Sequence, residues 1–148
     1  MIISEILAPE RILCEVRAAS KKTALEEMSR LIANYDPSLS YIEIFDNLNA
    51  RERLGSTGLG NGIAIPHARL KGIEKPLAAF MQLADAIDFD SVDKQPVDLL
   101  FGLVVPADST EEHLKILACI AEKCCQKDLL DNLRSQTSPE KIYEILSN

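Results

Sequence analysis

The chain has 148 residues, of which 47% are hydrophobic and 26% charged, a composition typical of a water-soluble globular domain. Sixteen Lys and Arg against 23 Asp and Glu give a formal net charge of −7, which argues against nucleic acid as a partner, because nucleic-acid binding requires clustered positive charge. No apolar run approaches the roughly 18–20 residues of a membrane-spanning helix, so we expect no membrane insertion. We predict a single domain over residues 1–148.

The first residues and the cysteines bear on the cellular compartment. Met1 to Pro9 include Glu5 and lack the basic start and apolar core of a signal peptide, which favours a cytoplasmic protein. In that compartment cysteines stay reduced. The four cysteines contain no Cys-x-x-Cys pair and are interpreted as plain buried or half-buried thiols: Cys14, Cys119, Cys124 and Cys125.

The first part of the chain predicts two helices. An apolar stretch from Arg11 to Val16 precedes a helix that Ser20 caps and that ends before Pro37. Ser40 begins a second helix with the capping-box spacing Ser-x-x-Glu. This helix should end near Gly55, because four glycines follow within eight residues.

The middle of the chain predicts three strands. They are expected over Ile63 to Ile65, Leu77 to Leu83 and Val97 to Val105. The third has almost no polar residue after Asp98, which indicates a central strand that is covered on both faces.

The last part of the chain is helical in pattern. Ser109 has capping-box spacing before a long amphipathic segment, a shorter helix is expected from Asp128 to Arg134, and Ser138 with a following proline begins the last helix. Helices both before and after a block of strands favour an α/β fold, a three-layer α/β/α sandwich.

His67 ends a glycine-rich segment that begins at Gly58 and contains the expected strand 63–65. Pro66, which lacks an amide hydrogen, separates His67 from that strand. An imidazole just beyond a strand end and beside glycines lies where ligand-contacting residues often occur. Position alone leaves open the alternative of a plain surface histidine after a turn.

His113, the other histidine, falls in the first turn of the helix expected after Ser109. The helix dipole favours anions there and disfavours a charged imidazolium. A neutral histidine can donate one N–H to an anion and keep its other nitrogen for an internal partner. His113 alone also fits an exposed residue near a helix start. Together with His67 it fits a pair in which one imidazole is a nucleophile and the other helps to hold a phosphoryl group.

Arg51 and Arg53 precede the glycines in the last turn of the second helix. Cations at this position complement the negative end of a helix. Alternatively, one guanidinium folds back over the glycine-rich segment and presents its planar fork to a phosphate or to a backbone carbonyl. Ser56 and Thr57 could add hydroxyl donors, although both are also ordinary turn residues.

Other kinds of site fit these residues less well. A zinc site lacks a third ligand at a known spacing, and a Walker-type phosphate loop lacks the Gly-Lys-Ser/Thr sequence. A dinucleotide-binding segment would open a helix, whereas these glycines precede a strand. A Cys–His pair remains possible in principle but has no local motif. We therefore expect neither a metal nor a cofactor.

The segment from Arg51 to Arg69, RERLGSTGLGNGIAIPHAR, resembles the active-site segment of enzyme IIA proteins of the fructose/mannitol type in the bacterial phosphoenolpyruvate phosphotransferase system. It is most similar to the nitrogen-regulatory branch of that family. Three further segments, Gln95 to Phe101, Val105 to Asp108 and Glu112 to Leu114, match the same branch. Together these matches cover most of positions 40–120.

The resemblance implies roles for three residues. His67 aligns with the phosphoacceptor histidine and His113 with the second active-site histidine. Arg51 aligns with the arginine that supports the site. Arg53 matches the sequence motif of the family but has no assigned role. It also implies a mixed central sheet and phosphorylation at Nε2. The visible departure is Ala68-Arg69, where a glycine is common, and we expect it to change the rim of the site and the preference for partners.

The resemblance further implies a phosphocarrier with a mainly regulatory role. It would receive its phosphoryl group from an HPr-like phosphocarrier protein, downstream of an enzyme I-type protein, and act on targets such as potassium-transport or sensor proteins. One alternative is a sugar-specific enzyme IIA that passes phosphate to a IIB component, and the absence of a fused transport or IIB segment favours the regulator. Another is an adaptor that binds partners without phosphate.

Overall fold

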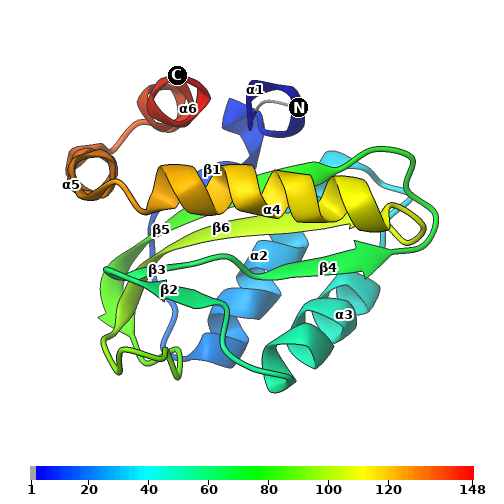
Figure 1. Ribbon diagram of the computed structural model, residues 1–148, viewed down its shortest axis with the longest axis horizontal. Helices are drawn as coiled ribbons and strands as arrows, with labels where there is room; N and C mark the ends of the chain where they lie inside the picture. The colour runs from blue at the N-terminus through cyan, green and yellow to red at the C-terminus, as the bar shows by residue number, and fades with distance from the viewer. Residues whose placement is uncertain (1–2) are drawn as a thin grey trace.

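The computed structural model describes residues 3–148 as a six-stranded mixed sheet with helices on both faces (Figure 1). The expected three-layer α/β/α sandwich is confirmed. The strands are β1 (Ile12–Val16), β2 (Gly58–Gly60), β3 (Ile63–Ala64), β4 (His67–Leu70), β5 (Leu77–Ile87) and β6 (Val97–Pro106). The helices are α1 (Ile3–Ile6), α2 (Lys21–Tyr35), α3 (Tyr41–Arg53), α4 (Thr110–Cys124), α5 (Lys127–Ser135) and α6 (Pro139–Ser147), with a short 3-10 helix, η1 (Pro9–Arg11).

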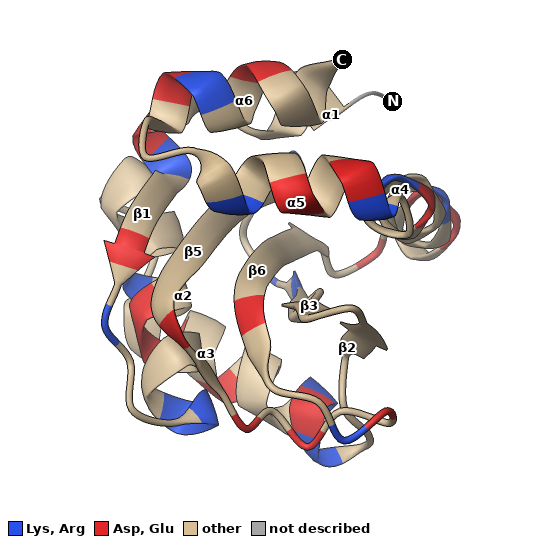
Figure 2. Cartoon of the chain, turned by 90° about the vertical axis from the view of Figure 1, so that its left-hand side faces the viewer, with Lys and Arg blue, Asp and Glu red and all other residues tan. Residues whose placement is uncertain are grey.

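Strand β6 lies at the centre of the sheet, as its apolar sequence predicts. It pairs antiparallel with β5 on one side and parallel with β3 and β4 on the other. Because side chains alternate along a strand, Phe101 and Leu103 pack towards α4, α5 and α6, whereas Leu100 and Val104 pack towards α2 and α3. Charged residues gather on the helices and loops around this apolar sheet (Figure 2).

Three of the four predicted helix caps are made by the serine side chain. Ser20, Ser40 and Ser138 each accept a hydrogen bond from the backbone N–H three residues further on, at 3.1, 3.4 and 3.4 Å. Helix α4 also begins where predicted, but the expected side-chain cap at Ser109 is wrong. Its ψ of 66° departs from the extended backbone of the other caps, so its hydroxyl does not reach the amides of the first turn.

Two strands, β2 and β4, lie outside the positions at which the sequence predicts strands. β2 pairs antiparallel with β3 through a tight turn at Asn61 and Gly62, whose φ angles of 56° and 81° are left-handed. His67 follows the end of β3, as expected, and it also begins β4, which the sequence does not predict. The predicted strand 63–65 ends at Ala64, and the chain pairs with β6 again from His67, in the same register.

Gln82, a buried polar residue of β5, joins the C-terminal helices to the sheet. Its amide nitrogen donates hydrogen bonds to the carbonyl oxygens of Leu133 at 2.9 Å and Gln136 at 2.7 Å, at the end of α5. Its oxygen accepts from the Glu15 amide of β1 at 3.2 Å. The last carbonyls of a helix have no partner within the helix, so Gln82 satisfies groups that burial would otherwise leave unpaired.

Gln82→Leu should lower the free energy of unfolding by about 1–3 kcal/mol, because it leaves these buried backbone groups without partners. Urea unfolding followed by circular dichroism measures the change. The control is Gln95→Leu, at an exposed glutamine whose side chain makes no hydrogen bond within residues 3–148, and it should stay within about 0.5 kcal/mol of the parent. Equal stability of the two variants would contradict the structural role of Gln82.

Candidate functional site

The backbone next to His67 determines which ring nitrogen carries its hydrogen. Nδ1 of His67 lies 2.8 Å from the carbonyl oxygen of Ile65. A carbonyl oxygen only accepts, so Nδ1 must donate, and in the neutral ring Nε2 then carries the lone pair. The two residues stand on either side of Pro66, only two positions apart. The half-buried imidazole therefore has a nucleophilic nitrogen that is not used by the backbone.

The pleat of β4 separates its four residues between the two faces of the sheet. Ala68 and Leu70 are buried with the residues of α2 and α3. His67 and Arg69 therefore point to the opposite face, which α4 covers (Figure 1). Ala68 does not reach the rim of the site, contrary to expectation, whereas Arg69 is exposed beside it.

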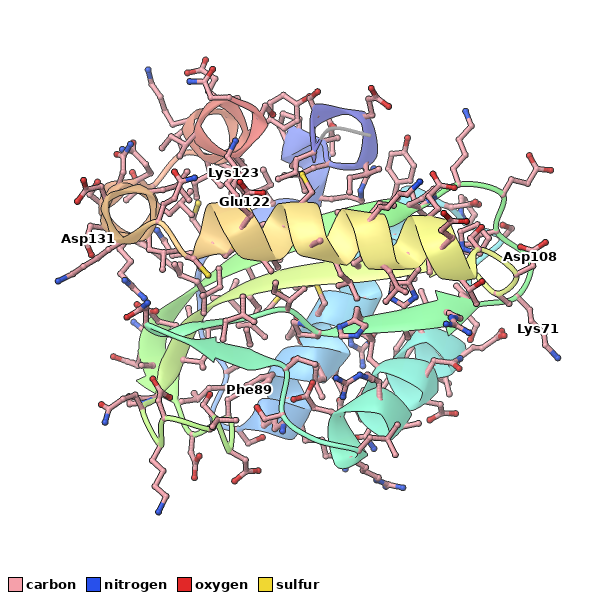
Figure 3. The ribbon with its side chains drawn as sticks, in the orientation of Figure 1. Lys71, Phe89, Asp108, Glu122, Lys123 and Asp131 are labelled. Atoms are coloured by element: carbon pink, nitrogen blue, oxygen red, sulfur yellow. The ribbon has the colours of Figure 1, made fainter. Side chains whose placement is uncertain are left out.

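His113 reaches the same place from α4. β4 runs parallel to β6, with His67 opposite Leu103, and the short turn 107–109 after β6 leads directly into the helix. Figure 3 shows Asp108 of this turn and Lys71, just after β4, at the same end of the molecule. The ring centroids of His67 and His113 are 5.4 Å apart, with an interplanar angle of 76°. The structure thus brings the two predicted histidines together.

The ring nitrogens of His113 have different surroundings. Nδ1 lies 3.4 Å from Nε of Arg69. Nε2 is buried and has no hydrogen-bond partner among residues 3–148. The side chain as a whole is only 8% exposed. A buried N–H without a partner is unfavourable by about 1–3 kcal/mol, so this nitrogen is available to an acceptor that enters the site.

Arg51 lies in the last turn of α3, and its Nη1 donates to the carbonyl oxygen of Gly55 at 2.8 Å. Of the two interpretations offered by the sequence, the guanidinium thus folds back onto a backbone carbonyl of the turn before β2. Its positive charge lowers the pKa of both His67 and His113. Arg53, by contrast, is exposed and makes no side-chain hydrogen bond or ion pair within residues 3–148.

Both histidines have a pKa below the usual 6.5. Burial is the main cause for each, because a charged ring loses solvation. For His67 the Arg51 charge adds to this effect, while the Ile65 carbonyl and the Glu52 carboxylate oppose it. For His113 the His67 ring, where it is protonated, and the positive charges of Arg69 and Arg51 add to it. Both rings are therefore neutral at pH 7, the state that a nucleophile and a hydrogen-bond donor of this kind require.

Glu52 is a buried carboxylate that the sequence interpretation missed. It accepts hydrogen bonds from the Thr57 amide at 2.8 Å and the Thr57 hydroxyl at 2.6 Å, and it forms an ion pair with Lys21 at 3.1 Å. The available signal was spacing, since Glu52 continues the buried stripe of Ile44 and Leu48 at steps of four residues. Glu52 thereby fixes the turn that leads from Arg51 to β2.

The hydroxyls of Ser56 and Thr57 are already used inside the protein. Ser56 donates to the Phe89 carbonyl oxygen at 3.0 Å, and Thr57 donates to Glu52. On the far side of the glycine-rich segment, Arg134 of α5 forms an ion pair with Asp98 at 2.9 Å and also donates to the Asn61 carbonyl oxygen. Contacts from α3, from α5 and from the loop between β5 and β6 therefore hold the segment that leads to His67.

The cysteines and acidic residues form no second centre in the part of the chain that the structure describes. No three His, Cys, Asp or Glu side chains lie close enough there to hold a metal ion. Cys124 is buried, which raises its pKa to about 12, and Cys14 is half-buried, as expected; Cys119 and Cys125 are exposed, so the expectation is wrong for them. Within residues 3–148 no helix has the length and apolar content needed to cross a membrane.

The fold and the paired histidines define a class of protein that the comparisons identify. Residues 5–148 match the family described as "Phosphoenolpyruvate-dependent sugar phosphotransferase system, EIIA 2", and the chain belongs to this family. The resemblance to this family is confirmed. Within the family, the chain is 48% identical to a nitrogen regulatory protein of Pseudomonas aeruginosa over 97% of its own length and 94% of that protein.

Further relatives agree with this placement. A PTS system fructose-specific EIIA component of Haloferax volcanii is 34% identical, over 98% of this chain and 94% of that one. The structure is similar to that of the nitrogen regulatory protein IIA-Ntr from Neisseria meningitidis, with a TM-score of 0.92, 41% identity and coverage of 97% and 98%. Mannitol IIA from Escherichia coli has the same fold, with a TM-score of 0.78, 20% identity and coverage of 94% and 97%.

Replacing Arg51 by Gln should raise the pKa of both His67 and His113, because it removes a positive charge that disfavours the imidazolium of each. An NMR titration of the two imidazoles measures both midpoints. Arg53→Gln removes the same charge two residues away and should leave both midpoints where they are. Unchanged midpoints in Arg51→Gln would show that the guanidinium does not act on the pair.

Proposed function

We propose that this chain is a cytoplasmic phosphocarrier of a nitrogen-related phosphotransferase system. It accepts a phosphoryl group on His67 from the phosphohistidine of an HPr-like donor, which an enzyme I-type protein supplies, and it acts on target proteins according to its phosphorylation state. The observation that carries the proposal is the 2.8 Å bond between His67 Nδ1 and the Ile65 carbonyl oxygen, because it leaves the lone pair on Nε2.

Phosphoryl transfer between two histidine nitrogens requires little general acid–base catalysis. Nε2 of His67 attacks the phosphorus in line, the new N–P bond forms as the N–P bond of the donor breaks, and the electron pair of that bond returns to the donor nitrogen. The positive charge that the His67 ring gains is stabilised by the Ile65 carbonyl oxygen, which accepts from Nδ1. Positioning and charge stabilisation are then the main requirements.

The groups around His67 suit an anion. The Nε2–H of His113 is a buried donor without a partner among residues 3–148, and Arg51 adds a positive charge near both rings. Together they make the surroundings of His67 favourable for an anion, although the chain as a whole has a net charge of −7. We assign His113 and Arg51 to stabilising the phosphoryl group, and Arg53 to no role in the chemistry.

Exposed apolar residues lie close in the sequence to the residues of the site, as expected if the phosphoryl donor is a protein. Leu54, Leu59 and Leu114 are 84%, 43% and 66% exposed. Leu54 comes three residues after Arg51, and Leu59 lies within β2. Leu114 comes directly after His113. Exposed apolar side chains near a polar centre are typical of surfaces that bind proteins.

A regulatory role follows from what phosphorylation does to this surface. A phosphoryl group adds a charge of about −1.5 to −2 at neutral pH, beside Arg51 and Arg69. The local positive charge is therefore largely neutralised, and target proteins can distinguish the two states. The names of the relatives in Pseudomonas aeruginosa and Neisseria meningitidis support nitrogen regulation, and the family resemblance suggests potassium-transport or sensor proteins as targets.

Mass spectrometry of the chain after incubation with phosphoenolpyruvate, enzyme I and an HPr-like protein should detect one added phosphoryl group. His67→Ala should remain unmodified, because it lacks the acceptor nitrogen. His113→Ala and Arg51→Ala keep the acceptor but should be modified roughly 10²-fold more slowly, as expected for the loss of one stabilising donor or charge. Arg53→Ala is the matched control and should react at the parent rate. Phosphorylation of the His67→Ala variant would contradict the assignment of His67 as the acceptor.

A sugar-specific enzyme IIA is the second candidate, and the 34% identity to a fructose-specific EIIA component favours it. The two candidates differ in the next step. The regulator should keep its phosphoryl group when a purified IIB component is added, whereas a sugar-specific protein should lose it to that component. An adaptor that binds without phosphate would show no mass change in either experiment.

A further inference from the structure

We infer that Arg69 is a positioning residue, which donates its Nε–H to His113 Nδ1 and thereby holds His113 in the tautomer with its hydrogen on Nε2, beside His67. The consequence for phosphoryl transfer rests on the function proposed above. The contact and the tautomer, however, are properties of the unmodified protein and can be measured without a phosphoryl donor.

The contact follows from the pleat of β4. Residues two apart on a strand share a face, so Arg69 stands next to His67 on the side that α4 covers. Arg69 lies opposite Val105 of β6, just before the turn that leads to His113. An arginine at this position therefore meets the imidazole from the strand side, through Nε at 3.4 Å.

The chemistry of the two groups fixes the direction of the hydrogen bond. A guanidinium has five N–H donors and no acceptor, so His113 Nδ1 must accept. In a neutral imidazole the hydrogen must then be on Nε2. If the hydrogen moved to Nδ1, or if the ring turned over, the contact with Arg69 would be lost.

The opposite tautomers of the two histidines give them different tasks. In His67 a carbonyl oxygen accepts from Nδ1 and leaves a lone pair on Nε2. In His113 an arginine donates to Nδ1 and leaves a hydrogen on Nε2. Phosphoryl oxygens are acceptors, so only this tautomer of His113 can donate to a group bound to His67. The other would direct a lone pair at those oxygens.

Long-range 1H–15N correlation spectra of the unphosphorylated full chain test the inference directly, because they distinguish the protonated from the unprotonated ring nitrogen. In the parent protein His113 should show hydrogen on Nε2 only. In Arg69→Ala the His113 signals should move towards a mixture of the two tautomers, while His67 keeps hydrogen on Nδ1. Arg69→Lys keeps the charge but lacks Nε–H, so it should resemble Arg69→Ala.

The control is Lys71→Ala. Lys71 is exposed, makes no hydrogen bond or ion pair within residues 3–148, and extends away from the molecule in Figure 3. Its loss removes a positive charge near the end of β4 without touching His113, so the spectrum should be that of the parent. Phosphorylation of His67 should be roughly tenfold slower in Arg69→Ala than in Lys71→Ala, as is usual when the partner that orients a functional histidine is removed.

Identical His113 spectra in the parent and Arg69→Ala would overturn the inference, as would hydrogen on Nδ1 of His113 in the parent. Restoration of the parental spectrum and rate by Arg69→Lys would also overturn it, because charge alone would then suffice. If His67 proves not to accept phosphate at all, the proposed function fails, but the spectra still decide whether Arg69 orients His113.

Discussion

The double-sided burial of β6 is the constraint on which the rest of the molecule depends. Its alternate side chains, such as Phe101 and Leu100, belong to the two cores that hold the helical layers on the sheet. β6 also provides the parallel edge on which β4 pairs, and its end leads into α4. His67 and His113 come from elements that β6 positions directly, so the distance between their rings is set by the packing of the sheet.

An acidic chain can hold an anion site when its nearby carboxylates are already neutralised. Glu52, the buried carboxylate near the site, is bound by Lys21 and by two donors of Thr57. It contributes rigidity to the turn before β2 while its charge is balanced by an ion pair. Arg51 and Arg69 then contribute the local field: one is bound to the Gly55 carbonyl, the other to His113. Neither arginine is paired with a carboxylate in the part of the chain described here.

Sequence patterns predicted the layers, the central strand and the paired histidines, because these depend on apolar periodicity and on a long motif. They did not predict β4, since four residues carrying His67 and Arg69 show no apolar run, and only pairing with β6 makes them a strand. For the same reason they did not predict that Arg69, besides lying at the rim of the site, contacts His113. Glu52 was missed because its charge conceals its place in the stripe of Ile44 and Leu48.

The two tautomers of the site are held by different kinds of partner, and this difference has consequences for variation. The Nδ1 of His67 is bound by a backbone carbonyl, which no substitution at Ile65 removes as long as the main chain keeps its path from β3 to β4. The Nδ1 of His113 is bound by a side chain, which a single substitution at Arg69 removes. The tautomer of His67 is thus determined by the path of the main chain, whereas the tautomer of His113 depends on the residue at position 69. Related chains that keep both histidines can therefore differ in how firmly the second one is oriented.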